Sequence, residues 1–537
     1  MKGIVRFPQQ SRSGKMTEHI DAPTLKSWLS DGREIALLDV REAGQFGEAH
    51  PFFAIPLPYS RFELALPQLA PNPSVRIVLC DDGDGVAARA ARRAEALGYR
   101  NVHILAGGAP AWGRAGYTLY AGVNVPSKTF GELVEHRRHT PRITAQELQA
   151  MRDAGDDMVI VDGRPYAEYH RMNIPDGICC PNGELALRIG AIAPDPKTKI
   201  VVNCAGRTRS IIGAQTLIDF GVPNPVVALE NGTQGWFLAG FKIENGATRR
   251  HPDSGTRDVA ALAVRARAVA EKHAVAYVPP ATVQAWLGDT AHTTYLLDVR
   301  TAEEFAADGV AGFVNAPGGQ LIQATDQWVG VKGARLTLVD GEMVRAPMVA
   351  AWLRQLGHDA CVIEGGVAAA RALPWRRSAG AKLAPLPTIA PADAAPAIAG
   401  GTLRAIDLRA GMTFRKGHAA GSVWSIRPRI GAAAPDVRPV VLIADEPEVA
   451  ALAAHDLAAA GCKDVRLLAG GFDAWRAAGL PVEATPDVPA DSECIDFLFF
   501  TARRHDNDPE AARQYLAWET GLLGQLDEQE RGVFRMA

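Results

Sequence analysis

One short segment of the chain combines a thiol with closely spaced positive and hydrogen-bonding groups. In "KIVVNCAGRTRSIIGAQTL", residues 199–217, Cys204 ends an apolar run and is followed by a glycine, two arginines, a threonine and a serine. A thiol at the carboxyl end of a strand, before a tight loop that opens into a helix, meets backbone N–H groups and a helix N-terminus that favour an anion. Arg207 and Arg209 add positive charge. We therefore expect Cys204 to act as a nucleophilic thiolate beside groups that can hold a sulfur-bearing oxyanion.

The remaining cysteines lack this setting. The chain has seven cysteines in 537 residues, an odd number with no CxxC pair, and this usage predicts reduced thiols with neither a disulfide framework nor a metal site. The adjacent Cys179 and Cys180 could have a redox role. Neighbouring residues of an extended chain point in opposite directions, however, so packing is the favoured interpretation for this pair.

The elements around Cys204 recur along the chain. Four times, an apolar run ends in Asp and an Arg follows two residues later; a second apolar run, a polar loop, an alanine-rich helical stretch and a last strand with a glycine turn come next. Strands that alternate with helices predict an α/β fold, with one parallel sheet per repeat and helices on both of its faces. The four pairs are Asp39 and Arg41, Asp162 and Arg164, Asp298 and Arg300, and Asp407 and Arg409.

A constant spacing identifies the residue of each repeat that corresponds to Cys204. Asp162 precedes Cys204 by 42 positions, and the same interval from the leading Asp of the first and third repeats ends at Asp81 and Asp340. A carboxylate cannot carry sulfur as a thiol can. The second repeat is therefore predicted to hold the reactive thiol, and the others to be structural or partner-binding.

Two further assignments follow from this register. In the shorter fourth repeat the corresponding residue is Ala444 or Asp445. Cys80 falls one position before the reactive position of the first repeat, inside the strand, so its side chain should face the core as a small hydrophobic group.

The repeats divide the chain into four modules and a tail. Helical linkers are expected between modules 1 and 2 and before module 3, and a Pro/Ala-rich linker between modules 3 and 4. The tail should contain a helix over roughly 508–531 that packs on the body. The predicted ranges are 17–121, 140–245, 276–376 and 386–486 for modules 1 to 4, and 490–537 for the tail.

Four repeats with a leading Asp-x-Arg, a Cys-loop-helix in "CAGRTRS" and closing turns of the Gly-Gly-x-x-x-Trp type resemble the rhodanese family. This resemblance implies a sulfurtransferase in which the cysteine takes the outer sulfur of thiosulfate or a related donor as a persulfide and passes it to a thiol or cyanide. It implies that Cys204 is the nucleophile and that Arg209 braces the loop and the donor anion. The amides that would cradle the outer sulfur are those of Ala205, Gly206, Arg207, Thr208, Arg209 and Ser210.

The resemblance also assigns roles in the segment after the first strand of module 2. Arg164 and Glu168 match the family's segment in which an arginine often helps to bind the donor anion. Asp162 is expected to be a structural hydrogen-bond acceptor, because the modules without a thiol keep the same residue. Asn173 stands where the family often has a histidine, which leaves a mechanism built on the cysteine and its loop intact.

Composition and charge limit the partners. A formal net charge of −3 gives no electrostatic case for nucleic acid or an anionic membrane, and no apolar run is long enough to span a bilayer. The N-terminus has no apolar core of a secretory signal, so a cytoplasmic location is expected. The expected partners are a small sulfur donor and a thiol or thioredoxin-like acceptor, with no cofactor.

Two other functions remain open at this point. Cysteine-dependent phosphatases and arsenate reductases also use loop amides and an arginine, but their arginine is the sixth residue after the cysteine, whereas here the sixth is Ser210 and Arg209 is the fifth. Alternatively, the modules could form a scaffold with one vestigial thiol. The arginines and helix retained around Cys204 argue against a scaffold.

Overall fold

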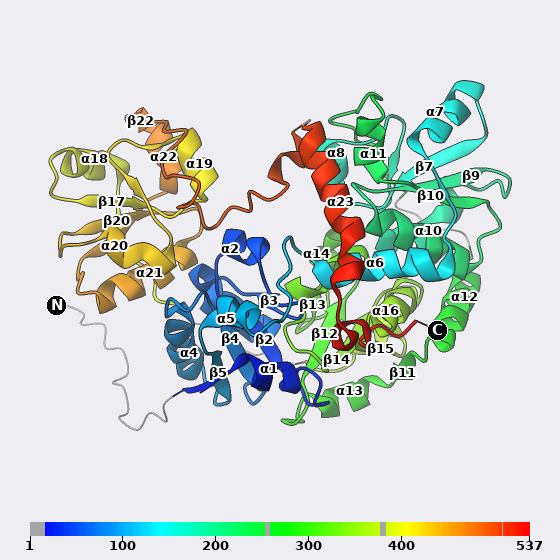
Figure 1. Ribbon diagram of the computed structural model, residues 1–537, viewed down its shortest axis with the longest axis horizontal. Helices are drawn as coiled ribbons and strands as arrows, with labels where there is room; N and C mark the ends of the chain where they lie inside the picture. Colours follow the sequence, from blue (N-terminus) through cyan, green and yellow to red (C-terminus); the bar gives the residue numbers. More distant parts are fainter. Residues whose placement is uncertain (1–16, 253–257, 376–382, 507, 537) are drawn as a thin grey trace.

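The chain folds as four α/β modules bound together by its C-terminal tail (Figure 1). The computed structural model describes residues 17–252, 258–375, 383–506 and 508–536. Each module has a five-stranded parallel sheet with the same strand order, which in module 2 is β6-β10-β9-β7-β8. The predicted fold class is confirmed.

The sheet of module 2 places strand β9 at its centre. The residues of β9 alternate between two cores: Ile200 and Val202 pack with helices α9 and α10 on one face, and Val201 packs with α7 and α11 on the other. Because β9 is covered on both faces, its carboxyl end is the place where a loop can emerge between the two helical layers. The elements are β6 (Arg142–Ile143), α7 (Ala145–Ala154), β7 (Met158–Asp162), α8 (Tyr166–Arg171), β8 (Ile178–Cys179), η2 (Asn182–Glu184), α9 (Leu185–Ile192), β9 (Lys199–Asn203), α10 (Thr208–Phe220), β10 (Val226–Leu229) and α11 (Gly232–Leu238).

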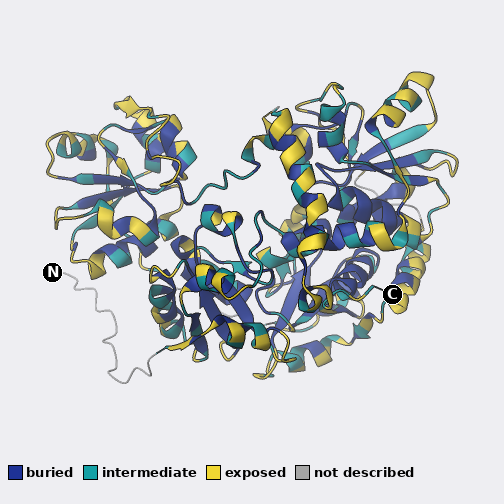
Figure 2. Cartoon of the chain, viewed as in Figure 1, coloured by how far each residue is buried: buried dark blue, intermediate teal, exposed yellow. Residues whose placement is uncertain are grey.

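Modules 1 and 3 repeat this arrangement, with buried central strands, dark in Figure 2, beneath helices that are exposed on their outer sides. Module 1 contains β1 (Glu18–Ile20), α1 (Ala22–Trp28), β2 (Ala36–Asp39), α2 (Ala43–Glu48), β3 (Ile55–Pro56), η1 (Tyr59–Arg61), α3 (Phe62–Leu69), β4 (Ile77–Cys80), α4 (Val86–Ala96), β5 (Val102–Leu105) and α5 (Gly108–Arg114). Module 3 contains β11 (Ala276–Val278), α13 (Pro280–Trp286), β12 (Thr294–Asp298), α14 (Ala302–Asp308), β13 (Val314–Asn315), α15 (Gly318–Gln323), η3 (Thr325–Gln327), β14 (Arg335–Val339), α16 (Arg345–Gln355), β15 (Asp359–Ile363) and α17 (Gly366–Ala370).

Module 4 has a short antiparallel pair of strands, β18 with β22, that is separate from its parallel sheet. Its elements are β16 (Thr388–Ile389), α18 (Pro391–Ala399), β17 (Arg404–Asp407), α19 (Gly411–Lys416), β18 (His418–Ala419), β19 (Val423–Trp424), η4 (Arg427–Arg429), α20 (Ile430–Ala433), β20 (Val440–Ile443), α21 (Pro447–Ala459), β21 (Val465–Leu468), α22 (Gly471–Ala477) and β22 (Val482–Glu483). No helix in the described part of the chain has the length and apolar character needed to cross a membrane.

The two expected linker helices are α6 (Val125–Arg138) and α12 (Val259–Lys272). Part of the predicted Pro/Ala-rich linker, residues 376–382, lies outside the described residues. In the tail, η5 (Ala502–His505) precedes α23 (Pro509–Gln525), and α24 (Glu528–Arg531) follows. A single helix over 508–531 is therefore wrong. Leu526 is extended, and Asp527 starts a new helix through a capping box with Glu530.

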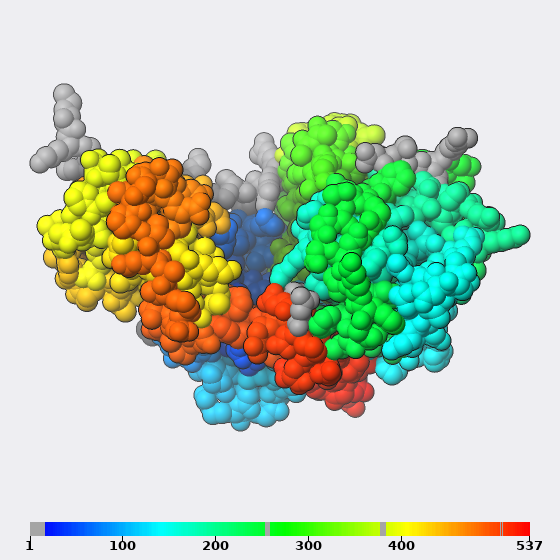
Figure 3. Space-filling view, turned by 90° about the horizontal axis from the view of Figure 1, so that it is seen from above, coloured from blue at the N-terminus to red at the C-terminus, as the bar shows by residue number. Residues whose placement is uncertain are grey.

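The tail crosses from module 4 over module 1 to module 2 and ends beside module 3 (Figures 1 and 3). The carbonyl of Ile495 accepts a hydrogen bond from the Gly44 amide of module 1, and the Arg535 amide donates to Gln355 of module 3. The indole of Trp518 donates to the carbonyl of Ala121, and Leu522 is fully buried. The expectation that the tail packs on the body is confirmed.

Buried ion pairs connect module 1 to module 4 and module 2 to module 3. At the first interface, Arg427 of η4 is 0% exposed and donates to both carboxylate oxygens of Glu63. The same interface has an exposed pair between Arg61 and Glu446, with side chains 45% and 51% exposed. The interface between modules 1 and 4 therefore has one buried and one exposed ion pair, and their contributions to stability can be compared.

We expect Arg427→Met to destabilise the protein by about 3–5 kcal/mol, because it leaves the buried Glu63 carboxylate without its main partner. Arg61→Gln is the matched control and should cost about 0–1 kcal/mol. Urea unfolding of both variants measures the difference. Equal losses in the two variants would contradict this account of the interface.

Candidate active site

Cys204 lies directly after the central strand β9, as the repeat spacing predicts. Its side chain is buried, with the whole residue 2% exposed. Its carbonyl accepts hydrogen bonds from the amide of Thr233, at 2.8 Å, and from the hydroxyl of Thr233, at 2.9 Å. The carbonyl of Ala205 accepts from the amide of Gln234 at 3.0 Å. These contacts fix the first two loop carbonyls against the start of α11.

A glycine makes this close contact possible. At Gly232, φ is +53°, and an added Cβ would lie 2.4 Å from the carbonyl oxygen of Cys204 and 2.7 Å from that of Gly206. Both the left-handed backbone and the lack of space require glycine. The closing turn therefore determines how the reactive loop is oriented.

The backbone amides of residues 205–210 belong to the loop after β9 and to the first turn of α10. Within the described part of the chain, these amides have no hydrogen-bond acceptor. The carbonyl of Arg209 is held by the side-chain amide of Asn182 at 2.9 Å. A ring of donors at a helix N-terminus, without acceptors of its own, is suited to an anion.

The guanidinium of Arg209 is oriented by a carboxylate. Both terminal nitrogens donate to Glu168, each at 2.8 Å, and one also lies 3.4 Å from the amide oxygen of Gln320 in module 3. Burial alone would lower the pKa of Arg209, but the Glu168 carboxylate outweighs burial and raises that pKa. Arg209 and Glu168, predicted separately, are thus brought together as one pair.

Arg164 is also close to the site, but its donors are directed to the protein. Its guanidinium is 1% exposed, donates to Asp162 at 2.6 Å and to the carbonyl of Met172 at 2.7 Å. Asp162 also accepts from Asn203, next to Cys204. The same Asp–Arg pair is buried in the other three modules. The pair is structural in this geometry, and direct binding of the donor by Arg164 stays a prediction.

The other predicted loop residues turn toward different elements. Arg207 donates to Glu132 and Glu135 of linker helix α6, and it does not line the cavity described below. The hydroxyl of Thr208 donates to Glu519 of the tail at 2.7 Å. The hydroxyl of Ser210 is buried without a hydrogen-bond partner among the described residues.

A cavity of about 290 Å³ lies over this loop. Residues of the α6 segment, module 3 and the tail complete its wall, and those from module 2 are Arg164, Glu168, Arg171, Met172, Ala205 and Arg209. The lining residues from outside module 2 are Gly122, Val123, Asn124, Lys128, Gln320, Gln323, Ala324, Gln327, Leu498, Thr501, Arg504, Tyr515 and Trp518. The site is therefore assembled from four parts of the chain.

A buried charge network attaches the tail to the loop. The ammonium of Lys128 contacts the hydroxyl of Tyr515 at 2.5 Å and lies 3.4 Å from the carboxylate of Glu519. Burial would raise the pKa of Glu519, but Lys128 and Thr208 stabilise its charged form, and that pKa is lowered. Sequence reasoning missed this network because nothing in the sequence pairs residue 128 with residues 515 and 519.

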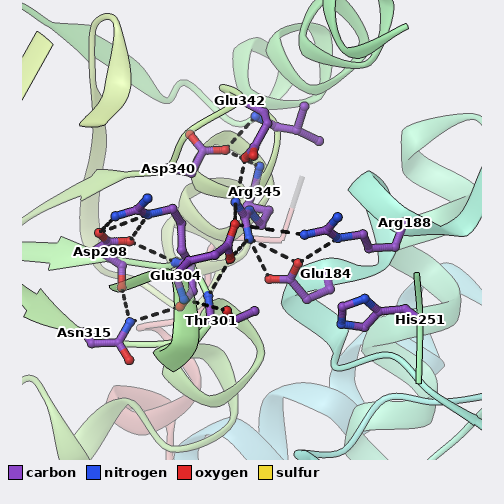
Figure 4. Close-up of polar contacts among 12 residues, drawn as sticks. Glu184, Arg188, His251, Asp298, Thr301, Glu304, Asn315, Asp340, Glu342 and Arg345 are labelled. Carbon is purple, nitrogen blue, oxygen red and sulfur yellow. Dashed lines mark hydrogen bonds and ion pairs between the residues drawn. The ribbon is translucent and has the colours of Figure 1, made fainter. Parts of the chain in front are cut away.

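Carboxylates fill the corresponding loops of modules 1 and 3. Asp340 accepts hydrogen bonds from the amides of Met343, Val344 and Arg345 at 3.1, 2.8 and 2.8 Å, and Arg345 is surrounded by glutamates (Figure 4). In module 1, the Asp81 carboxylate likewise accepts from the amides that follow it, those of Gly83, Gly85 and Ala87. In both modules, a side chain of the protein occupies the place of an external anion.

Module 4 has neither a thiol nor a carboxylate at this position. A Cβ on its closing glycine, Gly471, would lie 3.2 Å from the carbonyl of Ala444, as a Cβ on Gly232 would approach Cys204. Ala444, and not Asp445, is therefore the equivalent residue. Of the four equivalent residues, Asp81, Cys204, Asp340 and Ala444, only Cys204 has a thiol.

Comparison with known proteins agrees with this repeat. The family model of the rhodanese-like domain matches four segments, residues 21–115, 144–239, 279–372 and 390–478. The chain belongs to the rhodanese family. A crystal structure of a thiosulfate sulfurtransferase from Pseudomonas aeruginosa is 42% identical and covers 96% of this chain and 99% of its own, with a TM-score of 0.88.

A curated relative of this rhodanese is more distant. An HTH-type transcriptional regulator, Rv0324, from Mycobacterium tuberculosis is 34% identical over 111 residues, which are 21% of this chain and 48% of the relative. The chain thus spans about half the length of the curated relative that it matches.

The remaining cysteines of this rhodanese are packing residues in the structure. Cys80 ends β4 inside the core of module 1, as predicted, and burial raises its pKa well above the ordinary value. Cys179 and Cys180 point into different cores, one beside Tyr169 and the other beside Leu185. Burial raises the pKa of Cys179 to about 12, so this pair has the features of structural thiols.

We expect Gly206→Ala to loosen the tail from the reactive loop. An added Cβ would lie 2.8 Å from the Tyr515 ring and 2.9 Å from the Glu519 carboxylate, so the tail helix must shift. Hydrogen–deuterium exchange across residues 509–525 should increase. Gly521→Ala is the control, because no atom lies within 4 Å of its added Cβ. Unchanged exchange in Gly206→Ala would contradict this packing.

Proposed function

We propose that this rhodanese is a sulfurtransferase in which Cys204 carries sulfane sulfur as a persulfide. One observation supports the proposal above all others. Of the four equivalent loops, only this one begins with a thiol, and its amides have no acceptor among the described residues. In modules 1 and 3, Asp81 and Asp340 occupy the loop amides. Donors arranged in advance around a reacting sulfur stabilise the charge that develops there.

The first half-reaction takes sulfur from a donor such as thiosulfate. The Cys204 thiolate attacks the outer sulfur of the donor and forms a new S–S bond. The bond between that sulfur and the sulfonate sulfur breaks, and sulfite leaves with the bonding electron pair. The loop amides would hold the outer sulfur, and Arg209, kept charged by Glu168, would hold the donor oxygens.

The second half-reaction regenerates the enzyme. The sulfur of a thiol acceptor, or the carbon of cyanide, attacks the outer sulfur of the persulfide. The S–S bond to Cys204 breaks, and its electron pair returns to Cys204 as thiolate. A thiol acceptor becomes a persulfide, and cyanide becomes thiocyanate. We place this reaction in the cytoplasm, where free thiols are abundant, and the seven free cysteines are consistent with such a compartment.

Thiosulfate is the favoured donor, because a dianion suits a site with loop amides and an arginine. Activity on a phosphate ester tests the alternative, a cysteine-dependent phosphatase. We expect thiocyanate to form from thiosulfate and cyanide, with no colour from p-nitrophenyl phosphate. Hydrolysis of the phosphate ester, without sulfur transfer, would make the protein a phosphatase.

Thiosulfate treatment should increase the intact mass of the protein by one sulfur atom, and Cys204→Ser should abolish that increase. Cys80→Ser is the control, because this buried thiol faces the core and should leave the adduct unchanged. Peptide mapping should place the sulfur on Cys204. An adduct that persists in Cys204→Ser, or no adduct on either protein, would refute the proposed carrier.

Arg209→Gln should lower kcat/KM for thiosulfate by about 10²-fold, because it removes the cation and keeps the Glu168 carboxylate beside an anionic substrate. The control is Arg513→Gln, on the exposed side of the tail helix, where the side chain is 62% exposed. Steady-state assays with cyanide as acceptor measure both variants. A loss smaller than about threefold in Arg209→Gln would remove this residue from the donor site.

A further inference from the structure

The cavity beside the reactive loop is larger than the donor requires. Its volume is about 290 Å³, whereas thiosulfate is a small tetrahedral ion. Ala205 and Arg209 of the loop line the cavity beneath residues of the α6 segment, module 3 and the tail, and the neighbouring Cys204 is 2% exposed. This burial favours an acceptor small enough to enter the cavity over a folded protein.

Most cationic side chains that line the cavity already have a carboxylate partner. Arg209 pairs with Glu168 and Lys128 with Glu519. The pairs Arg164 with Asp162 and Arg171 with Asp506 account for two more. These cations are therefore largely neutralised within the protein.

Arg504 of η5 is different. It lines the cavity, its guanidinium stacks on the ring of Tyr515 at 4.7 Å, and one terminal nitrogen donates to the carbonyl and the hydroxyl of Thr501. In the described part of the chain it has no carboxylate partner, and its Nε is buried without a hydrogen-bond acceptor. Arg504 thus supplies a fixed positive charge and an unsatisfied donor at the roof of the cavity.

Neutral hydrogen-bonding groups lie on the module 3 side. Gln320, Gln323 and Gln327 line the cavity, and the amide oxygen of Gln323 is buried without a donor. A cation together with side-chain amides is suited to a small polar molecule that bears an anionic group. Because sulfite leaves before the acceptor enters, the acceptor has the whole cavity beside the loop.

We propose that Arg504 binds the carboxylate of a small thiol that accepts sulfur from the Cys204 persulfide. This inference rests on the proposed function. The acceptor thiol first loses its proton to solvent, and its thiolate then attacks the outer sulfur of the persulfide. The S–S bond to Cys204 breaks, and Cys204 leaves as thiolate with the electron pair. The product is the persulfide of the carboxylate-bearing thiol, and the acceptor carboxylate remains on Arg504 throughout.

The test compares two acceptors that differ in charge, 3-mercaptopropionate and its neutral amide, 3-mercaptopropionamide. Protein loaded with sulfur from thiosulfate is desalted and mixed with each thiol, and the decay of the persulfide is followed in single turnovers. We expect the wild type to prefer the carboxylate by about tenfold, the effect of one charge-assisted hydrogen bond. Arg504→Gln should reduce this preference to near unity.

Arg503→Gln is the matched control. The neighbouring arginine is 80% exposed, pairs with Asp508 and does not line the cavity, so this variant should keep the preference. In each protein the rates with the two thiols are compared with each other, and circular dichroism shows that the variants are folded.

Three results would overturn the inference. An equal preference in Arg504→Gln and wild type would exclude this contact. Slower persulfide formation from thiosulfate in Arg504→Gln, with the acceptor preference kept, would assign Arg504 to the donor. Rapid discharge of the wild type by reduced thioredoxin would show that a protein acceptor can enter. Failure of the proposed function would instead appear earlier, as no persulfide on Cys204.

Discussion

The close approach between a closing glycine turn and the carbonyl of the strand-end residue is the constraint on which the site depends. It recurs in all four modules, where the added Cβ of the glycine would lie 2.0–3.2 Å from that carbonyl oxygen. In module 2, the contact fixes the carbonyls on one side of the reactive loop, so the amides that begin α10 are left to serve another group. The side chain at the strand end then decides whether the loop is filled from within or can bind an external anion.

In modules 1 and 3, the same loop backbone is combined with a carboxylate in place of the thiol. A carboxylate of the protein accepts the loop amides there, which stabilises the loop but leaves no nucleophile. Such modules still contribute to the site in another way. Module 3 places glutamines in the wall of the cavity, and the tail that follows module 4 places an arginine and two aromatic residues over it. The candidate site of module 2 is thus assembled with residues of the α6 segment, module 3 and the tail.

The fold and the position of Cys204 after the central strand could be predicted from the sequence, because both depend on local patterns that repeat. These patterns are the Asp-x-Arg pairs, the interval of 42 residues and the closing turns. They place Cys204 at the start of its loop and Cys80 one position earlier, inside the strand. The loop orientations were less predictable: Arg207 turns to the glutamates of α6, a contact that depends on how the linker helix packs. The contributions of Lys128, Gln320 and Arg504 could not be predicted, since they depend on contacts between residues far apart in the chain.

The central claim is that sulfur is held on Cys204 by the amides of its loop. A crystal structure of the full chain after treatment with thiosulfate tests it most directly. The account predicts one additional sulfur atom bonded to Cys204 Sγ and within hydrogen-bond distance of the amides of residues 205–210, with the loops of Asp81 and Asp340 unchanged. Additional sulfur on another cysteine, or a Cys204 persulfide directed away from these amides, would contradict it.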